Sequence, residues 1–406
     1  MTKLLFWISA GLVAYVYFGY PLLLWFLPIF LSTSFRKKSI EPSISLLVAA
    51  YNEGLVIGAK IQNALTLDYP AERLEIVVAS DGSTDATAQV VRSFAEDKGL
   101  GRVRLLEFPK NRGKVATLND AIPRLNGEIV AFSDASSMLA PDSLRHLAQY
   151  FADPQVGGVS GVYSVLKKEW ARLGVQEGFY WKYETFLKVQ EAKLGGFTGA
   201  HGSLYAIRKE LYPFPPANTI NDDFIIPMRI WQRGFGIAYE PRAVAYEEAH
   251  EMEGFARRVR ITAGNVEQLL EVKGLLWPPR LVGLFCLLSH KAGRLLVPPV
   301  LVVLAIVNVM LWRDPLYQWF LRGQVLFYGL AALGALVKLR PGFLRLPYYF
   351  CMINSAFFAW IYHALRMGHV IPSRQELDQL GNPPSASEVS LRAPPQQNDL
   401  DRLEHD

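Results

Sequence analysis

The chain has 406 residues, enough for one large globular domain with additional segments, and its apolar residues gather toward the two ends. Its formal charge of +5 is mild, and basic clusters stand beside the apolar stretches, which argues against nucleic acid as a partner and favours anionic lipid headgroups or phosphates. Two cysteines, Cys286 and Cys351, stand in apolar stretches without metal-ligand spacing, so we expect them to pack rather than to react.

The first predicted element is a membrane anchor over residues 1–35. Residues 4–32 carry no charge and exceed the roughly 20 apolar residues that a membrane-spanning helix needs. No small-residue cleavage site follows the stretch, which favours a retained anchor over a removed signal peptide. Arg36, Lys37 and Lys38 come next, and a positive flank places the following segment in the cytosol.

Residues 43–270 alternate short apolar runs with longer mixed stretches. The runs predict strands at residues 43–50, 74–80, 103–108 and 127–134. The intervening stretches include predicted helices at residues 53–67 and 84–97. This alternation predicts an α/β domain with a doubly wound, mostly parallel sheet, in which ligands bind beyond the carboxyl ends of the strands.

Chemically useful side chains follow all four predicted strands. Tyr51 and Glu53 follow the first strand, Asp81 the second, Lys114 the third and Asp134 the fourth. Helix capping would explain any one of these groups. Together they suit a nucleotide diphosphate, with a ring to stack on the base, carboxylates for the nucleoside and cations for the phosphates. The sequence contains neither a Walker A motif nor a G-x-G-x-x-G fingerprint, which argues against an ATPase or a dinucleotide-dependent oxidoreductase.

Composition predicts the character of one segment inside the domain and of the segments that follow it. Residues 170–194 mix aromatic and charged side chains, and they either lie on lipid headgroups or pack on the domain. We expect an interfacial amphipathic segment at 271–296, membrane helices within 297–366 and a disordered tail at 376–406. Within residues 297–366, the expected membrane spans are 297–312, 324–337 and 348–365.

Five motifs resemble, in order and spacing, those of a family 2 glycosyltransferase with a GT-A fold. They are VAAYNE (48–53), ASDGSTDAT (79–87), NRGKVATLNDAI (111–122), FSDAS (132–136) and NDDFIIPMRIWQRGF (221–235). The resemblance covers residues 43–265 and is strongest to the membrane-bound branch that contains cellulose, chitin and hyaluronan synthases and bacterial exopolysaccharide transferases. It implies a Rossmann-like GT-A domain, flanked by transmembrane helices, that moves a sugar from a UDP-sugar to a glycan or lipid-linked acceptor with inversion.

The resemblance also implies a cellular setting. The protein would be a multi-pass component of the bacterial inner membrane with its catalytic domain in the cytosol. It would act in surface polysaccharide biosynthesis, in contact with membrane lipids and with polysaccharide-export partners.

The resemblance implies donor-binding roles for the strand-end residues. Tyr51 would flank the uracil, Glu53 would lie near the nucleoside and Asp81 would accept a hydrogen bond from the base. Lys114 would face the diphosphate. Asp134 would meet the sugar nucleotide and its divalent cation, Mg²⁺ or Mn²⁺, because hard cations prefer carboxylate and phosphate oxygens.

Acceptor-side roles are implied for residues later in the chain. Asp223, the second acid of Asp222-Asp223, would be the catalytic base that deprotonates the acceptor hydroxyl. Capping of the following helix is an alternative role for the pair, and the sequence permits both. Segment 195–212 resembles the family's acceptor-side turn and strand. Its His201 would either contact the acceptor or a phosphate, or be a hydrogen-bonded structural residue.

Two departures from the family pattern affect the expected activity. Polysaccharide synthases carry a Gln-x-x-Arg-Trp motif, and the matching positions here are Arg257, Arg260 and Ile261. Arg260 keeps a cation for the diphosphate, whereas Ile261 offers no stacking surface for sugar, which weakens the case for processive synthesis. Ser136 replaces the second aspartate of Asp-x-Asp and leaves Asp134 as the expected protein ligand of the metal.

Two other functions remain open from the sequence. A polyprenyl-phosphate monosaccharide transferase would use an acceptor that is already anionic and would not need Asp223 as a base. A non-enzymatic nucleotide-binding membrane component would bind UDP-sugar without releasing UDP, and the Asp222-Asp223 segment argues against it.

Overall fold

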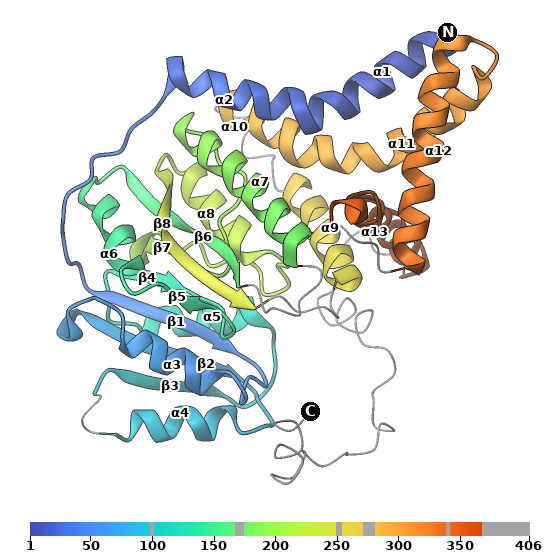
Figure 1. The fold of residues 1–406 in the computed structure, drawn as a ribbon. Helices are drawn as coiled ribbons and strands as arrows, with labels where there is room; N and C mark the ends of the chain where they lie inside the picture. The colour runs from blue at the N-terminus through green and yellow to red at the C-terminus, as the bar shows by residue number, and fades with distance from the viewer. Residues whose placement is uncertain (98–100, 167–173, 249–253, 271–280, 338–341, 368–406) are drawn as a thin grey trace, which may run out of the picture.

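The computed structural model describes residues 1–97, 101–166, 174–248, 254–270, 281–337 and 342–367. Figure 1 shows an α/β domain, and beside it a group of long helices formed by the two ends of the chain. The disordered tail expected at 376–406 lies outside the described residues.

The centre of the domain is an eight-stranded sheet with the order β3-β2-β1-β4-β7-β6-β8-β5. Its strands are β1 (Ile44–Ala50), β2 (Leu74–Asp81), β3 (Val103–Phe108), β4 (Ile129–Phe132), β5 (Met138–Leu139), β6 (Val156–Leu166), β7 (Tyr205–Arg208) and β8 (Gly236–Glu248). The first four strands in the order are parallel, whereas β7 runs antiparallel to both β4 and β6. The expected α/β, mostly parallel sheet is confirmed.

Helices cover both faces of this sheet (Figure 1). They are α3 (Ile57–Leu65), α4 (Thr87–Ala95), α5 (Lys114–Ala121), α6 (Ser143–Ala148), α7 (Gly174–Lys193) and α8 (Asp222–Gln232). A further helix, α9 (Gly254–Leu270), packs against α13 (Leu346–Met367) instead. Successive side chains of a strand point to opposite faces, so Leu46 and Val48 of β1 join one buried cluster and Leu47 joins the other. This two-sided burial explains why the strands read as continuous apolar runs in the sequence.

Three helices in the described part of the chain are long and apolar enough to cross a membrane. The first, Thr2–Leu31, consists of α1 (Thr2–Ala14), a π-helical turn η1 (Tyr15–Gly19) and α2 (Tyr20–Leu31). The second, Leu281–Met310, consists of α10 (Leu281–Cys286), a π-helical turn η7 (Leu287–Ala292) and α11 (Gly293–Met310). The third is α12 (Pro315–Leu336).

These helices differ in extent from the expected membrane segments. The helix expected from residue 297 begins at Leu281, so it includes 281–296 of the expected interfacial segment, while 271–280 lie outside the described residues. The segment expected at 348–365 forms α13 (Leu346–Met367), which has the length of a span but is not among the three apolar enough to be candidates.

Helix α7 contacts strands β6 and β8 and also helix α2. Glu184, Leu187, Lys188 and Glu191 of α7 are all buried. Over its described part, α7 therefore packs on the domain, the second of the two roles left open for residues 170–194, and it also contacts the candidate span Thr2–Leu31.

Candidate active site

The predicted donor-binding residues meet at one edge of the sheet. Strands β1 and β2 pair in parallel with Ala50 opposite Ser80, so Tyr51 and Asp81 emerge at neighbouring strand ends. Strand β4 pairs in parallel with the other side of β1, and Asp134 follows it two residues after Phe132. The parallel arrangement thus gathers residues that are far apart in the sequence, as ligand sites in such sheets require.

The loop after β1 is held against the loop after β2. Asn52 adopts a positive φ of 55°, which asparagine tolerates better than most residues, and its side-chain oxygen accepts a hydrogen bond from the Thr84 amide at 2.8 Å. The Asp85 carboxylate accepts a hydrogen bond from the Gly54 amide at 2.9 Å. Tyr51 is 46% exposed beside these hydrogen bonds, so part of its side chain is accessible to a ligand. Glu53 is partly buried and its amide donates to the Thr87 hydroxyl at 2.8 Å.

Asp81 organises the loop that precedes α5. Its two carboxylate oxygens accept hydrogen bonds from the amides of Arg112 at 3.0 Å and Gly113 at 2.8 Å. Gly82 has φ +67°, and a Cβ there would lie 2.4 Å from the Asn111 amide nitrogen. Glycine is therefore required for this loop to approach β2, and the loop delivers Lys114 to the first position of α5.

Lys114 joins the donor edge to helix α8. Its ammonium lies 2.9 Å from Asp134 Oδ1 and 3.3 Å from Asp222 Oδ2. Burial lowers the pKa of Lys114, whereas the carboxylates of Asp134 and Asp222 raise it, and the net pKa lies above the ordinary value. The residue is therefore a fixed cation between the two expected halves of the site.

Asp223 and Asp134 face the same space. A Cβ built on Gly202 would lie 3.4 Å from Asp223 Oδ2 and 3.7 Å from Asp134 Oδ2. The absence of a side chain at Gly202 thus leaves both carboxylates open to one region, the arrangement expected for a base beside a donor sugar. Burial, followed by the charge of Asp222, raises the pKa of the Asp223 carboxyl, against the opposing effect of nearby lysines.

The alternative role of Asp222 and Asp223 as capping residues is compatible with this geometry. Both stand in the first turn of α8, where negative charge stabilises the helix dipole. The pair can therefore stabilise α8 and face the site at once.

Ser136, at the position of the missing second aspartate, is bound to a different carboxylate. Its hydroxyl donates a hydrogen bond of 2.6 Å to Glu247 Oε1, from the end of β8. The buried ammonium of Lys60 supports the same loop through hydrogen bonds to the Ser133 hydroxyl and the Ser137 carbonyl. Burial lowers the pKa of Lys60 to about 7 despite the nearby negative charges of Asp134 and Glu247.

Neither Lys60 nor Glu247 was selected in the sequence analysis. Lys60 follows Ile57 by three residues and precedes Ile61 and Ala64, so its place on the buried stripe of α3 was a readable signal. Glu247 gave no such signal, because only the pairing of β8 places it beside the loop after β4.

This donor set fits a divalent hard cation. Within the described ranges, no three His, Cys, Asp or Glu residues gather as a ready-made metal site. Asp134 and Glu247 nevertheless supply carboxylate oxygens at the edge where the diphosphate is expected. One or two carboxylates completed by phosphate and water oxygens are typical of nucleotide-bound Mg²⁺ sites.

Of the residues expected on the acceptor side, His201 precedes β7 and the two arginines belong to α9. His201 is buried between the rings of Trp181 and Tyr239, with centroids 5.7 and 6.0 Å away, and its Nε2 has no hydrogen-bond partner among the described residues. Burial, with the charge of Lys188, lowers the pKa of His201 well below its ordinary value, so the imidazole is neutral. Arg257 and Arg260 both lie on α9, and Arg260 is partly buried.

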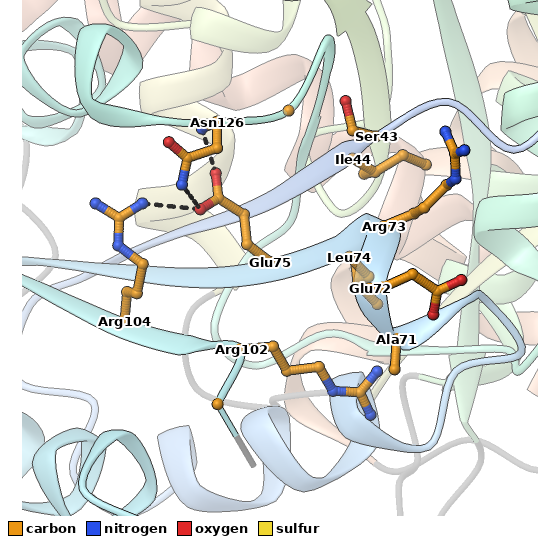
Figure 2. A pocket seen from close by; sticks show the side chains of 12 residues that line it. Ser43, Ile44, Ala71, Glu72, Arg73, Leu74, Glu75, Arg102, Arg104 and Asn126 are labelled. Atoms are coloured by element: carbon orange, nitrogen blue, oxygen red, sulfur yellow. Dashed lines mark hydrogen bonds and ion pairs between the residues drawn. The ribbon is translucent and has the colours of Figure 1, made fainter. Parts of the chain in front are cut away.

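A cavity of about 520 Å³ opens at the opposite edge of the sheet, where β1 and β2 begin (Figure 2). Arg104 and Asn126 bind the Glu75 carboxylate there, through hydrogen bonds of 2.8 Å from Arg104 Nη1 and from the Asn126 side-chain amide. Ligands of parallel α/β sheets bind beyond the carboxyl ends of the strands. The candidate site residues lie at those ends, so this cavity is separate from the candidate active site.

The α/β domain is similar to known proteins. The family described as "Glycosyltransferase like family 2" matches residues 42–263, more than half of the chain. Poly-beta-1,6-N-acetyl-D-glucosamine synthase of Staphylococcus epidermidis is 26% identical over 233 residues, which are 56% of this chain and 55% of that protein. The Staphylococcus aureus synthase is 28% identical over the same length. The chain therefore spans about half the length of these relatives.

A solved structure extends the similarity beyond the catalytic domain. Mannosyltransferase PcManGT from Pyrobaculum calidifontis, in complex with GDP-Man and Mn²⁺, matches with a TM-score of 0.66 and 25% sequence identity. The match covers 89% of this chain and 99% of that one, a larger share of the chain than residues 42–263 alone. The expected GT-A fold is confirmed.

Proposed function

The chain belongs to glycosyltransferase family 2, and on that premise we propose that it transfers a sugar from a UDP-sugar to a hydroxyl of a glycan or lipid-linked acceptor, with inversion at the anomeric carbon. Its resemblance to poly-beta-1,6-N-acetyl-D-glucosamine synthases supports a place in surface polysaccharide biosynthesis. The protein is an enzyme of the glycosyltransferase class, which removes the non-enzymatic alternative.

The observation that carries the proposal is the shared space in front of Gly202, which Asp134 and Asp223 face together. A hydroxyl held there would give its proton to Asp223 while its oxygen forms a bond to the anomeric carbon. The bond from that carbon to the diphosphate would break, and UDP would leave with the electron pair. A single in-line displacement of this kind inverts the anomeric centre.

Chain residues would hold the donor during this step. The open ring of Tyr51 would stack on the base, and Asp81 keeps the loop before Lys114 in place. Lys114 would stabilise the charge of the departing UDP. Asp134 and Glu247 would hold Mg²⁺ or Mn²⁺, which when bound neutralises charge on the diphosphate oxygens.

A second candidate donor follows from the structural comparison. PcManGT, which resembles this chain over nearly all of its own length, was solved with GDP-Man. A guanine base needs a larger pocket with a different hydrogen-bonding edge from that of uracil, and the Tyr51 platform would stack on either base. GDP-mannose is therefore the competing donor.

The acceptor side favours a limited number of transfers. Ile261 of α9 stands where polysaccharide synthases carry tryptophan, so the sugar-stacking surface expected for a growing glycan is missing at this position. Transfer to a polyprenyl phosphate is the alternative, in which the phosphate oxygen attacks and Asp223 is not needed as a base.

A membrane setting is supported by the candidate spans Thr2–Leu31, Leu281–Met310 and Pro315–Leu336. Arg36, Lys37 and Lys38 follow the first span and favour a cytosolic catalytic domain. We assign the protein to the bacterial inner membrane as a multi-pass enzyme, in contact with lipids and with polysaccharide-export partners.

The test presents the full chain, purified in lipid, with a panel of UDP-sugars and with GDP-mannose, each in Mg²⁺, Mn²⁺ or chelator. We expect release of UDP from one UDP-sugar, loss of release in chelator, and a product whose mass shows one or a few added sugars. Release of GDP from GDP-mannose alone would replace the donor assignment. The proposal would be overturned if the protein bound a nucleotide sugar but released nucleotide from none of the donors when lipid extract was present as a source of acceptor.

A further inference from the structure

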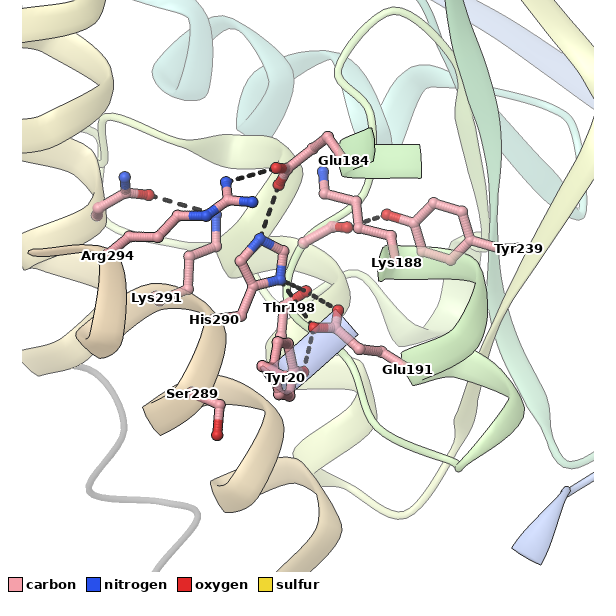
Figure 3. A network of polar contacts seen from close by, with 12 residues as sticks. Tyr20, Glu184, Lys188, Glu191, Thr198, Tyr239, Ser289, His290, Lys291 and Arg294 are labelled. Carbon is pink, nitrogen blue, oxygen red and sulfur yellow. Dashed lines mark hydrogen bonds and ion pairs between the residues drawn. The ribbon is translucent and has the colours of Figure 1, made fainter. Parts of the chain in front are cut away.

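We propose that Lys188 and Lys291 bind the phosphate of a lipid-linked acceptor on the membrane side of Asp223. The proposal rests on the glycosyltransferase function proposed above, since it states what the acceptor carries. It arises from a buried polar cluster between α7 and the membrane helix Leu281–Met310, which Figure 3 shows. We call this set the interhelix cluster, and its members are Tyr20, Glu184, Lys188, Glu191, His290, Lys291 and Arg294.

The two carboxylates of the interhelix cluster are already occupied. Glu184 lies 2.5 Å from Arg294 Nη1 and 3.0 Å from His290 Nε2. Glu191 lies 2.8 Å from His290 Nδ1 and accepts a hydrogen bond of 2.6 Å from the Tyr20 hydroxyl. Burial raises the pKa of Glu184, but its interactions with Arg294 and then His290 outweigh burial and keep that pKa well below its ordinary value. The direct partners of both glutamates are thus Arg294, His290 and Tyr20, while Lys188 acts on Glu184 through its charge without an ion pair between them in the described part of the chain.

The two lysines instead make hydrogen bonds to neutral oxygens. Lys188 Nζ donates to the Ala200 carbonyl at 3.1 Å, and Lys291 Nζ donates to Asn265 Oδ1 at 3.3 Å. Lys188 is 7% exposed, so its charge is largely removed from water. Burying an ammonium group costs free energy unless an anion compensates for it. An ammonium group has three donors, and each lysine makes one hydrogen bond to the described residues, which leaves donors for a phosphate oxygen.

The lysines lie next to the proposed base. The Asp223 carbonyl accepts a hydrogen bond from the Ala200 amide at 2.9 Å, and the Ala200 carbonyl accepts the bond from Lys188. Lys291 Nζ lies 6.0 Å from the ring centroid of Phe224, the residue after Asp223. The positive charges of Lys188 and Lys291 both lower the pKa of Asp223, which places them within electrostatic reach of its carboxylate.

The segment from Gly199 to Gly202 separates this lysine pair from the donor edge. A Cβ on Gly199 would lie 4.0 Å from Lys188 Nζ, whereas a Cβ on Gly202 would face Asp134 and Asp223. The donor diphosphate is expected at Asp134. An anion beside the lysines is therefore a second phosphate, on the acceptor side of the base.

The membrane helix identifies the source of that phosphate. Lys291 belongs to the candidate span Leu281–Met310 and lies in its π-helical turn η7, a distortion that often marks functional sites. A molecule that reaches Lys291 approaches along a helix embedded in lipid. A lipid that carries phosphate has the chemistry for this site, with its chain beside the helix and its head group beside Asp223.

The test measures binding without nucleotide, with the full chain in phosphatidylcholine nanodiscs. We expect farnesyl phosphate to bind at least about tenfold more tightly than farnesol, because one charge-assisted hydrogen bond is worth that much. Lys188→Met and Lys291→Met should each remove this preference, and Lys188→Arg should retain most of it. Lys182→Met is the matched control, because Lys182 is exposed on the same helix.

Each other outcome overturns a defined part of the proposal. Equal affinity of the unmodified protein for farnesyl phosphate and farnesol would remove the phosphate site, and this comparison needs no variant that might fail to fold. An equal loss in Lys182→Met would remove the assignment to Lys188. Orthophosphate that binds as tightly as farnesyl phosphate, or phosphatidylglycerol nanodiscs that abolish binding, would replace the lipid acceptor with a general anion. Absence of sugar transfer with intact farnesyl phosphate binding would overturn the proposed function and leave this site in place.

Discussion

The hydroxyl of Ser136 donates a 2.6 Å hydrogen bond to the carboxylate of Glu247, although 111 residues separate them. Ser136 stands where the family pattern has an aspartate. This neutral residue instead hydrogen-bonds the carboxylate of Glu247, which belongs to β8. The same loop carries Asp134, which faces the space in front of Gly202. We therefore treat Asp134 and Glu247, rather than Asp134 alone, as the carboxylates available to the divalent cation.

We predict that Glu247→Gln weakens Mn²⁺ binding in the presence of UDP by about 10- to 100-fold, the range found when a supporting carboxylate of a metal site is lost. Electron paramagnetic resonance of free Mn²⁺ measures this affinity without any turnover. Glu248→Gln is the control, because Glu248 is the adjacent acid of β8.

A compensating change sharpens this prediction. Adding Ser136→Asp to Glu247→Gln restores the carboxylate at the original position and should recover most of the Mn²⁺ affinity. Equal affinity of Glu247→Gln and the unmodified protein would show that Glu247 only anchors the loop.

We predict that Asp223→Asn lowers the rate of sugar transfer to a hydroxyl acceptor by about 10²- to 10⁴-fold, the usual contribution of a general base. UDP affinity should stay unchanged, because Asp223 is proposed to act on the acceptor. Product formation and nucleotide binding are measured on the same preparation. Retained transfer in this variant would exclude Asp223 as the base and would favour an acceptor phosphate as the attacking group.

Much of the fold was predictable because it follows from local patterns. The run at 103–108 matches β3 (Val103–Phe108), and β1 and β2 begin or end within one residue of the expected runs. Asp81 and Asp134 could be selected because any polar residue that directly follows a buried parallel strand lies at the ligand-binding edge. Their individual roles in donor binding remain predictions.

The less predictable residues depend on tertiary pairing. Glu247 reaches the Ser136 loop only because β8 is placed beside β5 in the sheet. Lys188 and Lys291 come within electrostatic reach of Asp223 only because the candidate span Leu281–Met310 packs beside α7 and α8, and neither position differs in sequence from an ordinary surface lysine. The candidate span begins at Leu281, before the expected residue 297, and His290, Lys291 and Arg294 lower the hydropathy of this first part. Two of them, His290 and Arg294, pair with Glu184 in the structure.

We predict that the rate of transfer to a hydroxyl acceptor falls at acid pH. The midpoint of this acid limb should lie above the ordinary pKa of aspartate. Transfer requires Asp223 to be deprotonated, and burial together with Asp222 raises the pKa of its carboxyl, so activity is lost as the pH falls through this raised pKa. Lys188 opposes the rise, so Lys188→Gln should move the acid limb of kcat to still higher pH. Lys182→Gln, at saturating acceptor, should leave the limb in place. A limb that moves to lower pH in Lys188→Gln would contradict the assignment of the titrating group to Asp223.

We predict that Gly82→Ala destabilises the protein and weakens UDP binding, because Gly82 lets the loop before Lys114 approach β2. A positive φ alone costs an alanine about 1–3 kcal/mol. The added Cβ would also lie 2.4 Å from both the Asn111 amide nitrogen and the Lys110 carbonyl carbon, so the backbone of the loop must move. Gly101→Ala is the matched control, because Gly101 also has positive φ, at +49°, but no atom within 4 Å of its Cβ position. Thermal unfolding and UDP titration compare the two variants. We expect a larger loss of stability in Gly82→Ala and a loss of UDP affinity in that variant alone. Equal losses in both would show that backbone strain, rather than the contact between the two loops, explains the glycine.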